Sequence, residues 1–385
     1  MKILLVKLSS LGDVVHTLPV VQDIRAALPD AQIDWVIEKS FAPLLWPLLA
    51  PGAGLTRVVT CELRRWRKAP LSALLHGPWR DFKSELQGVA YDAVIDLHGL
   101  SKSALVSRVS RLAPGGKRYA LANQTEGSSY EAPTRWVADV AIQIEPHVHA
   151  VQRGRELAAA ALGYTVESAP VYGLNWPVDQ SNPAQTAPET IASWTPPSIA
   201  LAHGSSRADK QWPLEHWIEL GLRLNAAGFE VLLPHGSVDE YSTSHLIARA
   251  LHASDAASPG ARVLPVLALD ALTRQLADCA GVIGVDSGVS HIAVALGLPH
   301  VQIYNFDTAW RTGPPDQPAD PAPRGDAVSS ASLAVGGARQ ISVFEHPCPG
   351  VDAVWNAWLA CGVDAAAPVA AEVPVFVRSD ALPSA

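Results

Sequence analysis

The chain has few cysteines, and their positions exclude two kinds of site. Four cysteines, Cys61, Cys279, Cys348 and Cys361, occur among 385 residues, and none belongs to a CxxC pair. This spacing argues against a zinc site and against a dithiol redox centre. Scattered thiols with apolar neighbours are typical of a reducing compartment. The sequence therefore predicts a cytoplasmic protein.

Long apolar runs are missing too. The first run begins at Ile3 and closes at Lys7, which is typical of a strand and not of a secretory signal. No run approaches the roughly 20 residues that a transmembrane helix needs. A net charge of −8 argues against non-specific binding of nucleic acid. We expect a soluble protein without a nucleic-acid partner, whose attraction to any anionic surface must come from a local patch.

Two ligand signatures are also absent. The loop after the first apolar run, residues 8–13, has no GxGxxG pattern, so a dinucleotide fingerprint is not supported there. No cluster of carboxylates has the spacing of a metal site. The sequence therefore predicts no cofactor and no metal ion.

The length and patterning of the chain indicate two domains. A chain of 385 residues is too long for one core, and 48% hydrophobic with 17% charged residues suits a packed globular protein. Short apolar strands alternate with amphipathic helices, which implies parallel sheets covered on both faces. We predict an α/β protein with two similar halves facing each other across a cleft. Their predicted bounds are 1–174 and 198–362, with a Pro- and Ser-rich linker at 175–197 and a flexible tail at 363–385.

The expected elements follow from these patterns. Strands are predicted at 3–6, 33–37, 57–60, 93–97, 117–121, 199–202, 230–233, 281–285 and 300–304. Helices are predicted at 14–28, 82–89, 101–112, 148–162, 213–227, 239–251, 270–278, 288–296 and 351–361, with Pro213 as a first helical residue. Residues 314–340 are expected to form a long loop.

The segment 203–213 is the most informative part of the chain. It follows an apolar strand and precedes a helix, the place where open α/β sheets hold their ligands. Its small residues let the backbone approach a phosphate, and Arg207 and Lys210 match the charge of a diphosphate. The hydroxyls of Ser205 and Ser206 can donate to phosphate oxygens. Lys210 is otherwise a surface lysine at a helix start, where its charge opposes the helix dipole.

A second loop of this kind precedes the helix predicted at 288–296. The free N–H groups of Ser287 and Gly288 can receive an anion. Asp286 has an alternative interpretation as a helix N-cap, and His291 has one as a packed histidine. Glu240, after another strand, could accept hydrogen bonds from ribose hydroxyls, or it is an exposed acid at a helix start.

The first half supplies candidates for the opposite side of the cleft. Asp13 follows the first strand and is either a helix N-cap or a catalytic base. His98 ends a strand and could titrate near neutrality, or it is a positioned polar residue, and Lys102 lies just beyond it. The dense basic run around Trp66 is either a solvated loop or a site for a polyanionic acceptor or lipid headgroup. Its basic residues are Arg64, Arg65, Arg67 and Lys68.

Together these motifs resemble a known family. The segments 7–19, 64–68, 203–213 and 285–291 closely resemble those of the bacterial lipopolysaccharide heptosyltransferases, above all the branch that adds the first heptose of the inner core. The likeness covers most of the chain to about Tyr304, and residues 305–310 depart from the pattern. It implies the glycosyltransferase type B fold, with two Rossmann-like domains and the active site between them.

The resemblance also implies substrates and residue roles. The donor would be ADP-L-glycero-β-D-manno-heptose, and the acceptor the inner 3-deoxy-D-manno-octulosonic acid (Kdo) of Kdo2-lipid A, at the cytoplasmic face of the inner membrane. Asp13 would be the base, Lys210 and Ser206 would hold the diphosphate, and Glu240 the nucleoside. The second loop would contact the diphosphate and heptose through Asp286, Ser287, Gly288 and His291. The basic run would meet acceptor phosphates and carboxylates.

Three alternatives stay open. A heptosyltransferase II shares this layout but uses a heptosylated acceptor, whereas the basic run favours the more anionic Kdo acceptor. A nicotinamide-dependent oxidoreductase is disfavoured by the missing glycine fingerprint. A non-catalytic sugar-nucleotide-binding module would not need both Asp13 and a diphosphate cradle in one chain.

Overall fold

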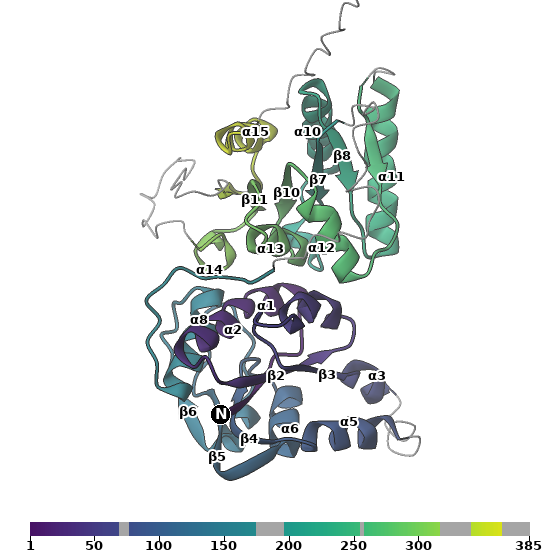
Figure 1. Ribbon diagram of the computed structural model, residues 1–385. Helices are drawn as coiled ribbons and strands as arrows, with labels where there is room; N and C mark the ends of the chain where they lie inside the picture. Colours follow the sequence, from purple (N-terminus) through teal and green to yellow (C-terminus); the bar gives the residue numbers. More distant parts are fainter. Residues whose placement is uncertain (69–76, 175–195, 255–257, 316–339, 364–385) are drawn as a thin grey trace, which may run out of the picture.

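The computed structural model describes residues 1–68, 77–174, 196–254, 258–315 and 340–363. Most of the predicted linker, almost all of the predicted tail and most of the predicted 314–340 loop lie outside these residues, so the predicted domain bounds stay predictions. Figure 1 shows two α/β bodies, one above the other, with the amino-terminal half of the chain below. Within the described residues, no helix is both long enough and apolar enough to cross a membrane.

The lower body contains one six-stranded parallel sheet. Its strands are β1 (Lys2–Val6), β2 (Gln32–Glu38), β3 (Arg57–Cys61), β4 (Ala90–Asp96), β5 (Arg111–Leu121) and β6 (Val140–Ile142). Its helices are α1 (Leu11–Val15), α2 (Leu18–Ala27), the 3-10 helix η1 (Ala42–Leu49), α3 (Leu63–Lys68), α5 (Pro78–Gln87), α6 (Ser101–Val109), α7 (Pro133–Val137) and α8 (Ala150–Leu162).

The upper body repeats this arrangement. Its strands are β7 (Ser198–Ala202), β8 (Glu230–Leu233), β9 (Ala261–Val263), β10 (Gly281–Val285), β11 (His300–Tyr304) and β12 (Gln340–Phe344). Its helices are the 3-10 helix η2 (Ala208–Lys210), α10 (Leu214–Ala226), α11 (Val238–Ser254), α12 (Leu269–Ala277), α13 (Gly288–Ala295), α14 (Ala309–Thr312) and α15 (Val351–Ala360).

The strand order positions the ligand loops. The first sheet has the order β3-β2-β1-β4-β5-β6 and the second has β12-β11-β10-β7-β8-β9, which is the Rossmann order in both cases. In such sheets the order reverses between the first and fourth strands, and ligands bind outside the carboxyl ends of those strands. Most of the candidate residues lie in or just after the loops that follow β1, β4, β7 and β10, whereas Glu240 follows β8 and the basic run follows β3. The predicted fold of two Rossmann-like domains is confirmed.

Some local predictions were wrong. The helix predicted at 14–28 is two helices, because α1 ends after one turn and α2 begins anew after Thr17. The alternative of a loop at the basic run is wrong, since residues 63–68 form α3. Pro213 is the N-cap of α10 and not its first helical residue. The short strands β6, β9 and β12 were not predicted.

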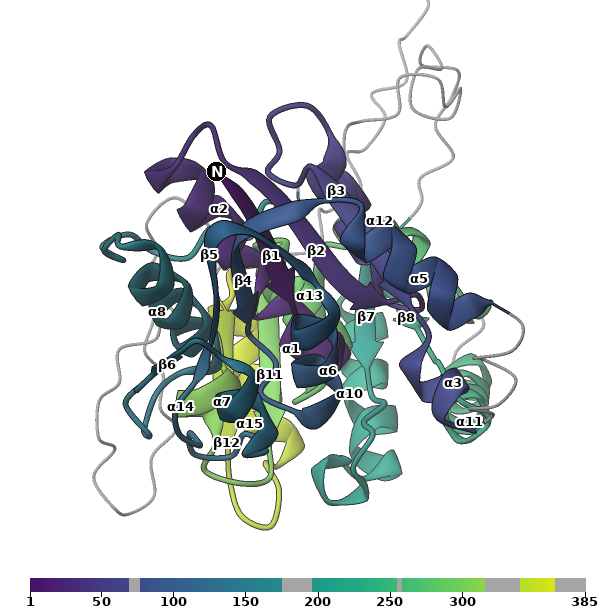
Figure 2. The ribbon, with the colours of Figure 1, turned by 90° about the horizontal axis from the view of Figure 1, so that it is seen from below.

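The two bodies share an apolar interface. One cluster of buried side chains includes Val14 and Val15 of α1 together with Ile292 and Ala293 of α13. Figure 2 shows α1 and α13 close together, in agreement with their contacts. A Cβ on Gly288 would lie 2.6 Å from Cγ of Leu11, so the two helices meet closely there. Burial of this surface ties the loop after β1 to the loop after β10.

A buried ion pair fixes α8 on α2. Arg155 donates from Nε and Nη2 to the two carboxylate oxygens of Asp23, at 2.7 and 2.9 Å. The side chains are only 3% and 10% exposed. Arg155 also donates to the carbonyl of Ser168. Because α8 carries Arg153 as well, this pair helps to place a residue of the site described below.

We expect Arg155→Ala to lower the free energy of unfolding by about 3–5 kcal/mol, because Asp23 would stay charged and buried without a partner. Urea denaturation followed by circular dichroism measures the change. The control is Arg223→Ala, whose partners Glu219 and Asp352 are largely exposed. Arg223→Ala should lower the free energy of unfolding by less than about 1 kcal/mol. Equal losses in the two variants would contradict the importance assigned to the buried pair.

Candidate active site

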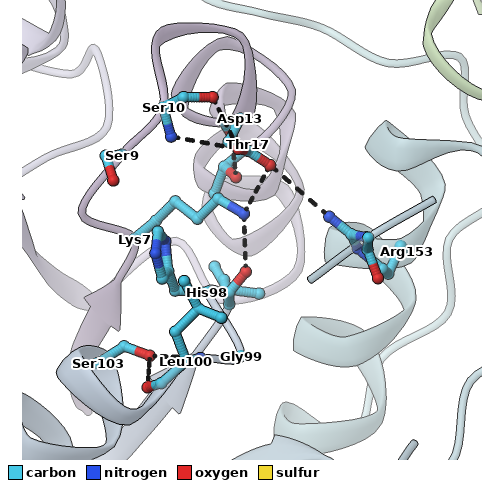
Figure 3. Close-up of polar contacts among 12 residues, drawn as sticks. Lys7, Ser9, Ser10, Asp13, Thr17, His98, Gly99, Leu100, Ser103 and Arg153 are labelled. Atoms are coloured by element: carbon cyan, nitrogen blue, oxygen red, sulfur yellow. Dashed lines mark hydrogen bonds and ion pairs between the residues drawn. The ribbon is translucent and has the colours of Figure 1, made fainter. Parts of the chain in front are cut away.

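Asp13 lies in the first turn of α1, and its carboxylate is held by the loop after β1. The N-cap of this helix is Ser10, and Asp13 is the third helical residue, so its interpretation as the N-cap is corrected. Oδ2 of Asp13 accepts hydrogen bonds from Ser10 N at 3.2 Å and from Ser10 Oγ at 2.9 Å. Oδ1 faces the Lys7 ammonium at 3.2 Å (Figure 3). Capping thus engages one oxygen of Asp13, and a cation faces the other.

Two cations determine the charge state of Asp13. Lys7 is buried, and Arg153 of α8 places Nη2 3.9 Å from Oδ1 of Asp13. Burial opposes the charge on Asp13, but Lys7, Arg153 and the bonds from Ser10 outweigh it and hold the pKa of Asp13 well below its usual range. Burial lowers the pKa of Lys7 in turn, which the charge of Asp13 opposes. Asp13 is therefore a carboxylate at neutral pH, and its side chain is 40% exposed, so a hydroxyl can reach it.

The loop after β4 forms the floor beside Asp13. Asp96 is buried and accepts from the backbone N–H groups of His98 and Gly99 and from the Ser103 hydroxyl. Burial raises the pKa of Asp96 to about 6. Burial, together with Lys7 and Lys102, lowers the pKa of His98 to about 2. The expectation that His98 could titrate near neutrality is therefore wrong, and His98 is a neutral side chain in this loop.

Lys102 contacts the loop after β1, which holds Asp13. Its ammonium, on the first turn of α6, donates to the Ser9 hydroxyl at 2.7 Å. Ser9 immediately precedes Ser10, which holds Asp13. Lys102 thus places a positive charge beside the loop that holds Asp13, and its part in a cationic acceptor face stays a prediction. His98 and Lys102 come to this place from the loop after β4 and its helix.

The basic run lies on α3, after β3. The Arg65 side chain is exposed, and its guanidinium lies 3.4 Å from Glu62. Trp66 packs against Trp79 and Phe82, with ring centroids 5.9 and 5.5 Å apart, so it is a packing residue. The side chains of Arg64, Arg67 and Lys68 lie outside the described part of the chain, and their acceptor-binding role stays a prediction.

On the opposite side, Lys210 pairs with Asp286. The Lys210 ammonium lies 2.5 Å from Oδ2 of Asp286, and His291 Nε2 lies 3.2 Å from Oδ1. Burial opposes the charge on Asp286, but His291 and Lys210 outweigh it, so the pKa of Asp286 lies well below its usual range. The loops after β7 and β10, both predicted to bind a phosphate, are thus in direct contact.

The remaining residues of these two loops have distinct environments. Ser287 is the N-cap of α13 and accepts from Ser290 N at 3.5 Å. Gly288 faces Leu11 of the first domain. Ser205 is half-buried and accepts from Arg207 N at 3.4 Å, whereas Ser206 is exposed. Both serines lie on the loop that leads to Lys210.

Glu240 lies next to a cavity that can hold a nucleoside. Its carboxylate accepts from Gly236 N at 2.7 Å and packs over Gly204, between the loops after β8 and β7. The neighbouring cavity has a volume of about 640 Å³, within the usual range for small-molecule sites. It is lined mainly by apolar and aromatic side chains, among them Tyr241, His245, Leu264, Pro265 and Val266.

Three residues that carry this geometry were missed in the sequence. Lys7 and Arg153 form the cationic frame of Asp13, and His16 lies between the two halves of the site. The His16 ring lies 4.2 Å from that of His291, and the charges of both Asp13 and Asp286 act on it. Burial, followed by His291 and His149, lowers the pKa of His16 well below its ordinary value, so it is neutral.

The two domains offer different chemistry, proton acceptance on the first and ligand binding on the second. An ionised carboxylate on the first domain can accept a proton or a hydroxyl hydrogen bond. A lysine, a glutamate and a nucleoside-sized cavity lie along the ends of β7, β8 and β10 in the second domain. In the described ranges, no three His, Cys, Asp or Glu side chains are grouped so as to hold a metal ion. The fold and the site are those of a protein with two Rossmann-like domains and one polar centre on each domain.

Comparisons with known proteins identify the family. A model of glycosyltransferase family 9 (heptosyltransferase) matches residues 79–320. Lipopolysaccharide heptosyltransferase 1 of Pseudomonas aeruginosa is 37% identical over 320 residues, which are 81% of this chain and 81% of that protein. Lipopolysaccharide heptosyltransferase 2 of Escherichia coli strain K12 is 27% identical over 79% of this chain and 82% of that protein.

A solved structure agrees with these relatives. The heptosyltransferase WaaC of E. coli, in a structure with ADP, superposes with a TM-score of 0.72 at 28% identity and covers 94% of this chain and 100% of that one. The chain belongs to glycosyltransferase family 9, the heptosyltransferases.

We expect Lys210→Ala to weaken ADP binding about ten- to hundredfold, because the predicted charge-assisted contact of its ammonium with the diphosphate would be lost. Isothermal titration with ADP measures the affinity, and thermal melts confirm that the variant is folded. Arg223→Ala is the matched control, since Arg223 of α10 belongs to the same domain but pairs with Glu219 and Asp352, away from the ligand loops. The cradle assigned to Lys210 is wrong if Lys210→Ala binds ADP as tightly as the control.

Proposed function

We propose that this glycosyltransferase transfers L-glycero-D-manno-heptose from ADP-heptose to the inner Kdo of Kdo2-lipid A in lipopolysaccharide inner-core biosynthesis. The single observation that carries the proposal is the opposed pair of polar centres, Asp13 on the first domain and Lys210–Asp286 on the second. The first domain, predicted as residues 1–174, would bind the acceptor. The second, predicted as 198–362, would bind the ADP-sugar.

The second domain supports the assignment of the donor. ADP is the ligand in the structure of the similar WaaC protein. In this chain, the cavity beside Tyr241 suits the adenine, and Glu240 suits the ribose hydroxyls. Lys210 with Ser205 and Ser206 would hold the diphosphate, and Ser287 and Gly288 would add N–H groups at the start of α13. Asp286 and His291 would then face the heptose.

The charge around Asp13 supports an anionic acceptor. Lys7 and Arg153 flank the carboxylate, and Lys102 holds the preceding loop, so cations outnumber Asp13 at this place. Kdo is a carboxylic acid, and its charge matches this excess. The acceptor role of Arg64, Arg65, Arg67 and Lys68 on the neighbouring α3 belongs to the same proposal.

The proposed reaction is a single in-line displacement with inversion. Asp13 takes the proton from the acceptor hydroxyl as its oxygen attacks the anomeric carbon. The bond from that carbon to the diphosphate oxygen breaks, and ADP leaves from the opposite face. Lys210 stabilises the charge that develops on the β-phosphate, so no metal ion is assigned to this step. His16 and Leu11 exclude water from the region between the two helices.

The alternatives are less well supported. Heptosyltransferase 1 and heptosyltransferase 2 relatives match this chain at 37% and 27% identity, which favours addition of the first heptose. Membership of a glycosyltransferase family disfavours both an oxidoreductase and a non-catalytic binding module.

We expect Asp13→Asn to abolish turnover while ADP binding stays close to the wild-type value, because the substitution removes the base but none of the donor contacts. The assay incubates the protein with ADP-heptose and Kdo2-lipid A in the presence of EDTA, and mass spectrometry detects the heptosylated product. A parallel reaction offers heptosyl-Kdo2-lipid A. If Asp13→Asn turned over near the wild-type rate, Asp13 would not be the base. If the wild-type protein preferred heptosyl-Kdo2-lipid A as acceptor, its activity would be that of heptosyltransferase II.

We also propose that the protein binds peripherally to the cytoplasmic face of the inner membrane, where a lipid A acceptor is held. Trp136 on α7 is 73% exposed and Leu105 on α6 is 46% exposed. Arg135 and Arg108 are exposed on the same two helices, which pack together. Exposed aromatic and basic side chains of this kind suit the interface of an anionic bilayer. The first turn of α6 carries Lys102, so this surface adjoins the site.

We expect Leu105→Ser/Trp136→Ser to bind phosphatidylglycerol vesicles about tenfold more weakly, since it removes apolar area from the membrane contact. Vesicle sedimentation measures binding, and phosphatidylcholine vesicles test the need for negative charge. Trp46→Ser is the control, because Trp46 is an exposed tryptophan (50%) on η1. An equal loss in both variants, or no loss in either, would contradict this docking surface.

A further inference from the structure

The short helix α14 makes contacts that neither the family resemblance nor the proposed reaction explains. It belongs to the second domain, yet it lies at the boundary above α8 of the first domain (Figure 1). Its contacts across this boundary come from residues that have no part in the proposed reaction.

Three side-chain contacts join this segment to the first domain. The Trp310 indole stacks on the His147 ring, with centroids 3.7 Å apart and an interplanar angle of 21°. Arg311 Nη1 donates to the carbonyl oxygen of Gly127. The third contact joins His149 Nε2 to the carbonyl oxygen of Gly313 at 2.9 Å.

The geometry of each contact is specific. Nδ1 of His149 accepts from Val151 N, so the proton sits on Nε2 and is donated to Gly313. Gly127 has a φ of +64°, and a Cβ there would overlap the Arg311 guanidinium. Only glycine meets both conditions easily. The carbonyl of Gly127 is thus presented to Arg311 by a backbone shape that few other residues adopt.

In the first domain, the residues that contact α14 are connected to Asp13 through Arg153. Gly127 lies in the loop that contains Thr125, whose hydroxyl accepts from Arg153 Nη1 at 3.0 Å. Arg153 in turn lies 3.9 Å from Asp13. The same loop is joined to the segment before α8 by the bond from Glu126 N to the Pro146 carbonyl, at 2.9 Å. Fixing Gly127 therefore restrains Arg153 beside the carboxylate.

In the second domain, α14 is connected to the loop after β10 through Thr312. Thr312, next to Arg311, donates to Oδ1 of Asp286 at 3.4 Å. Asp286 is the partner of Lys210. The segment 310–313 thus contacts the loop that binds Arg153 through Arg311, and it contacts Asp286, the partner of Lys210, through Thr312.

We propose that Trp310 and Arg311 are positioning residues for the transfer reaction, which latch the 125–127 loop to the second domain and so fix Arg153 beside Asp13. This inference rests on the proposed heptosyl transfer. Neither side chain takes part in the proton transfer or touches the donor cradle. Their effect reaches the acceptor through Arg153 and Asp13, because those residues face the attacking hydroxyl.

The first test separates acceptor from donor kinetics in Trp310→Ala and Arg311→Ala. Each variant is expected to lower kcat/KM for Kdo2-lipid A about two- to tenfold, the range of an aromatic pair. The KM for ADP-heptose should stay within about twofold, because Lys210, Glu240 and the nucleoside cavity lie within the second domain. Trp310→Phe should restore most of the acceptor kcat/KM, since a phenyl ring can still stack on His147. A loss of folded protein alone would lower the active fraction and leave both KM values unchanged.

The second test does not depend on turnover. Hydrogen exchange followed by mass spectrometry reports protection of the loop amides of Glu126 and Ser128, whose N–H groups bond to Pro146 and Thr125. Both Ala variants should speed exchange in this loop. The matched controls are Phe344→Ala and Arg249→Ala, exposed residues of the second domain on β12 and α11, and they should not change it.

The two tests distinguish the possible failures. If the wild-type protein does not transfer heptose, the proposed function fails, and the exchange measurement still decides whether the latch restrains the loop. If the wild type is active, wild-type acceptor kinetics in both Ala variants would overturn the positioning role. Unchanged loop exchange in both variants would overturn the latch itself.

Discussion

The close approach of α1 and α13 is the constraint on which the rest of the site depends. At the point of contact each helix has a glycine, and a Cβ on Gly12 would lie 2.7 Å from the His291 ring. Gly288 is equally close to Leu11. Larger residues at either position would separate the domains. Asp13 follows Gly12 directly and His291 lies one turn after Gly288, so this contact sets how far apart the two polar centres are.

The two centres follow the same physical rule. In each, a carboxylate at the ligand end of a parallel sheet stays ionised in spite of burial, because a lysine and a second side chain with N–H donors face it. Asp13 has Lys7 and Arg153, and Asp286 has Lys210 and His291. An ionised carboxylate is what a proton acceptor needs, and the carboxylate of Asp286 leaves the half-buried Lys210 with a counterion of its own.

The main strands and most of the candidate loop residues could be predicted from the sequence, because both follow from local sequence patterns. The strands β8, β10 and β11 have their predicted bounds because each is an apolar run closed by turn or helix-start residues. Asp13, Lys210 and Asp286 could be singled out because loops after such strands are where ligands bind. β6 and β9 are three-residue strands with partly exposed side chains, so they show no clear hydrophobic pattern.

What the sequence did not reveal depends on contacts between distant residues. Arg153 looks like any arginine of an amphipathic helix until the fold brings α8 to Asp13. His98 could not be recognised as a neutral histidine, because its low pKa comes from burial beside Lys7 and Lys102. His16 has a role only because α13 presents His291 to it. The buried pair of Asp23 and Arg155, separated by more than a hundred residues, is another such contact.

The pairing of Lys210 with Asp286 has a consequence for the catalytic cycle. If Lys210 holds the diphosphate as we propose, an entering diphosphate must compete with an internal counterion for the same ammonium, and the displaced carboxylate becomes available to hydroxyl groups of the sugar. On departure of the nucleoside diphosphate, Asp286 would pair with Lys210 again. One ion pair would then set both the affinity for the leaving group and the speed of its release.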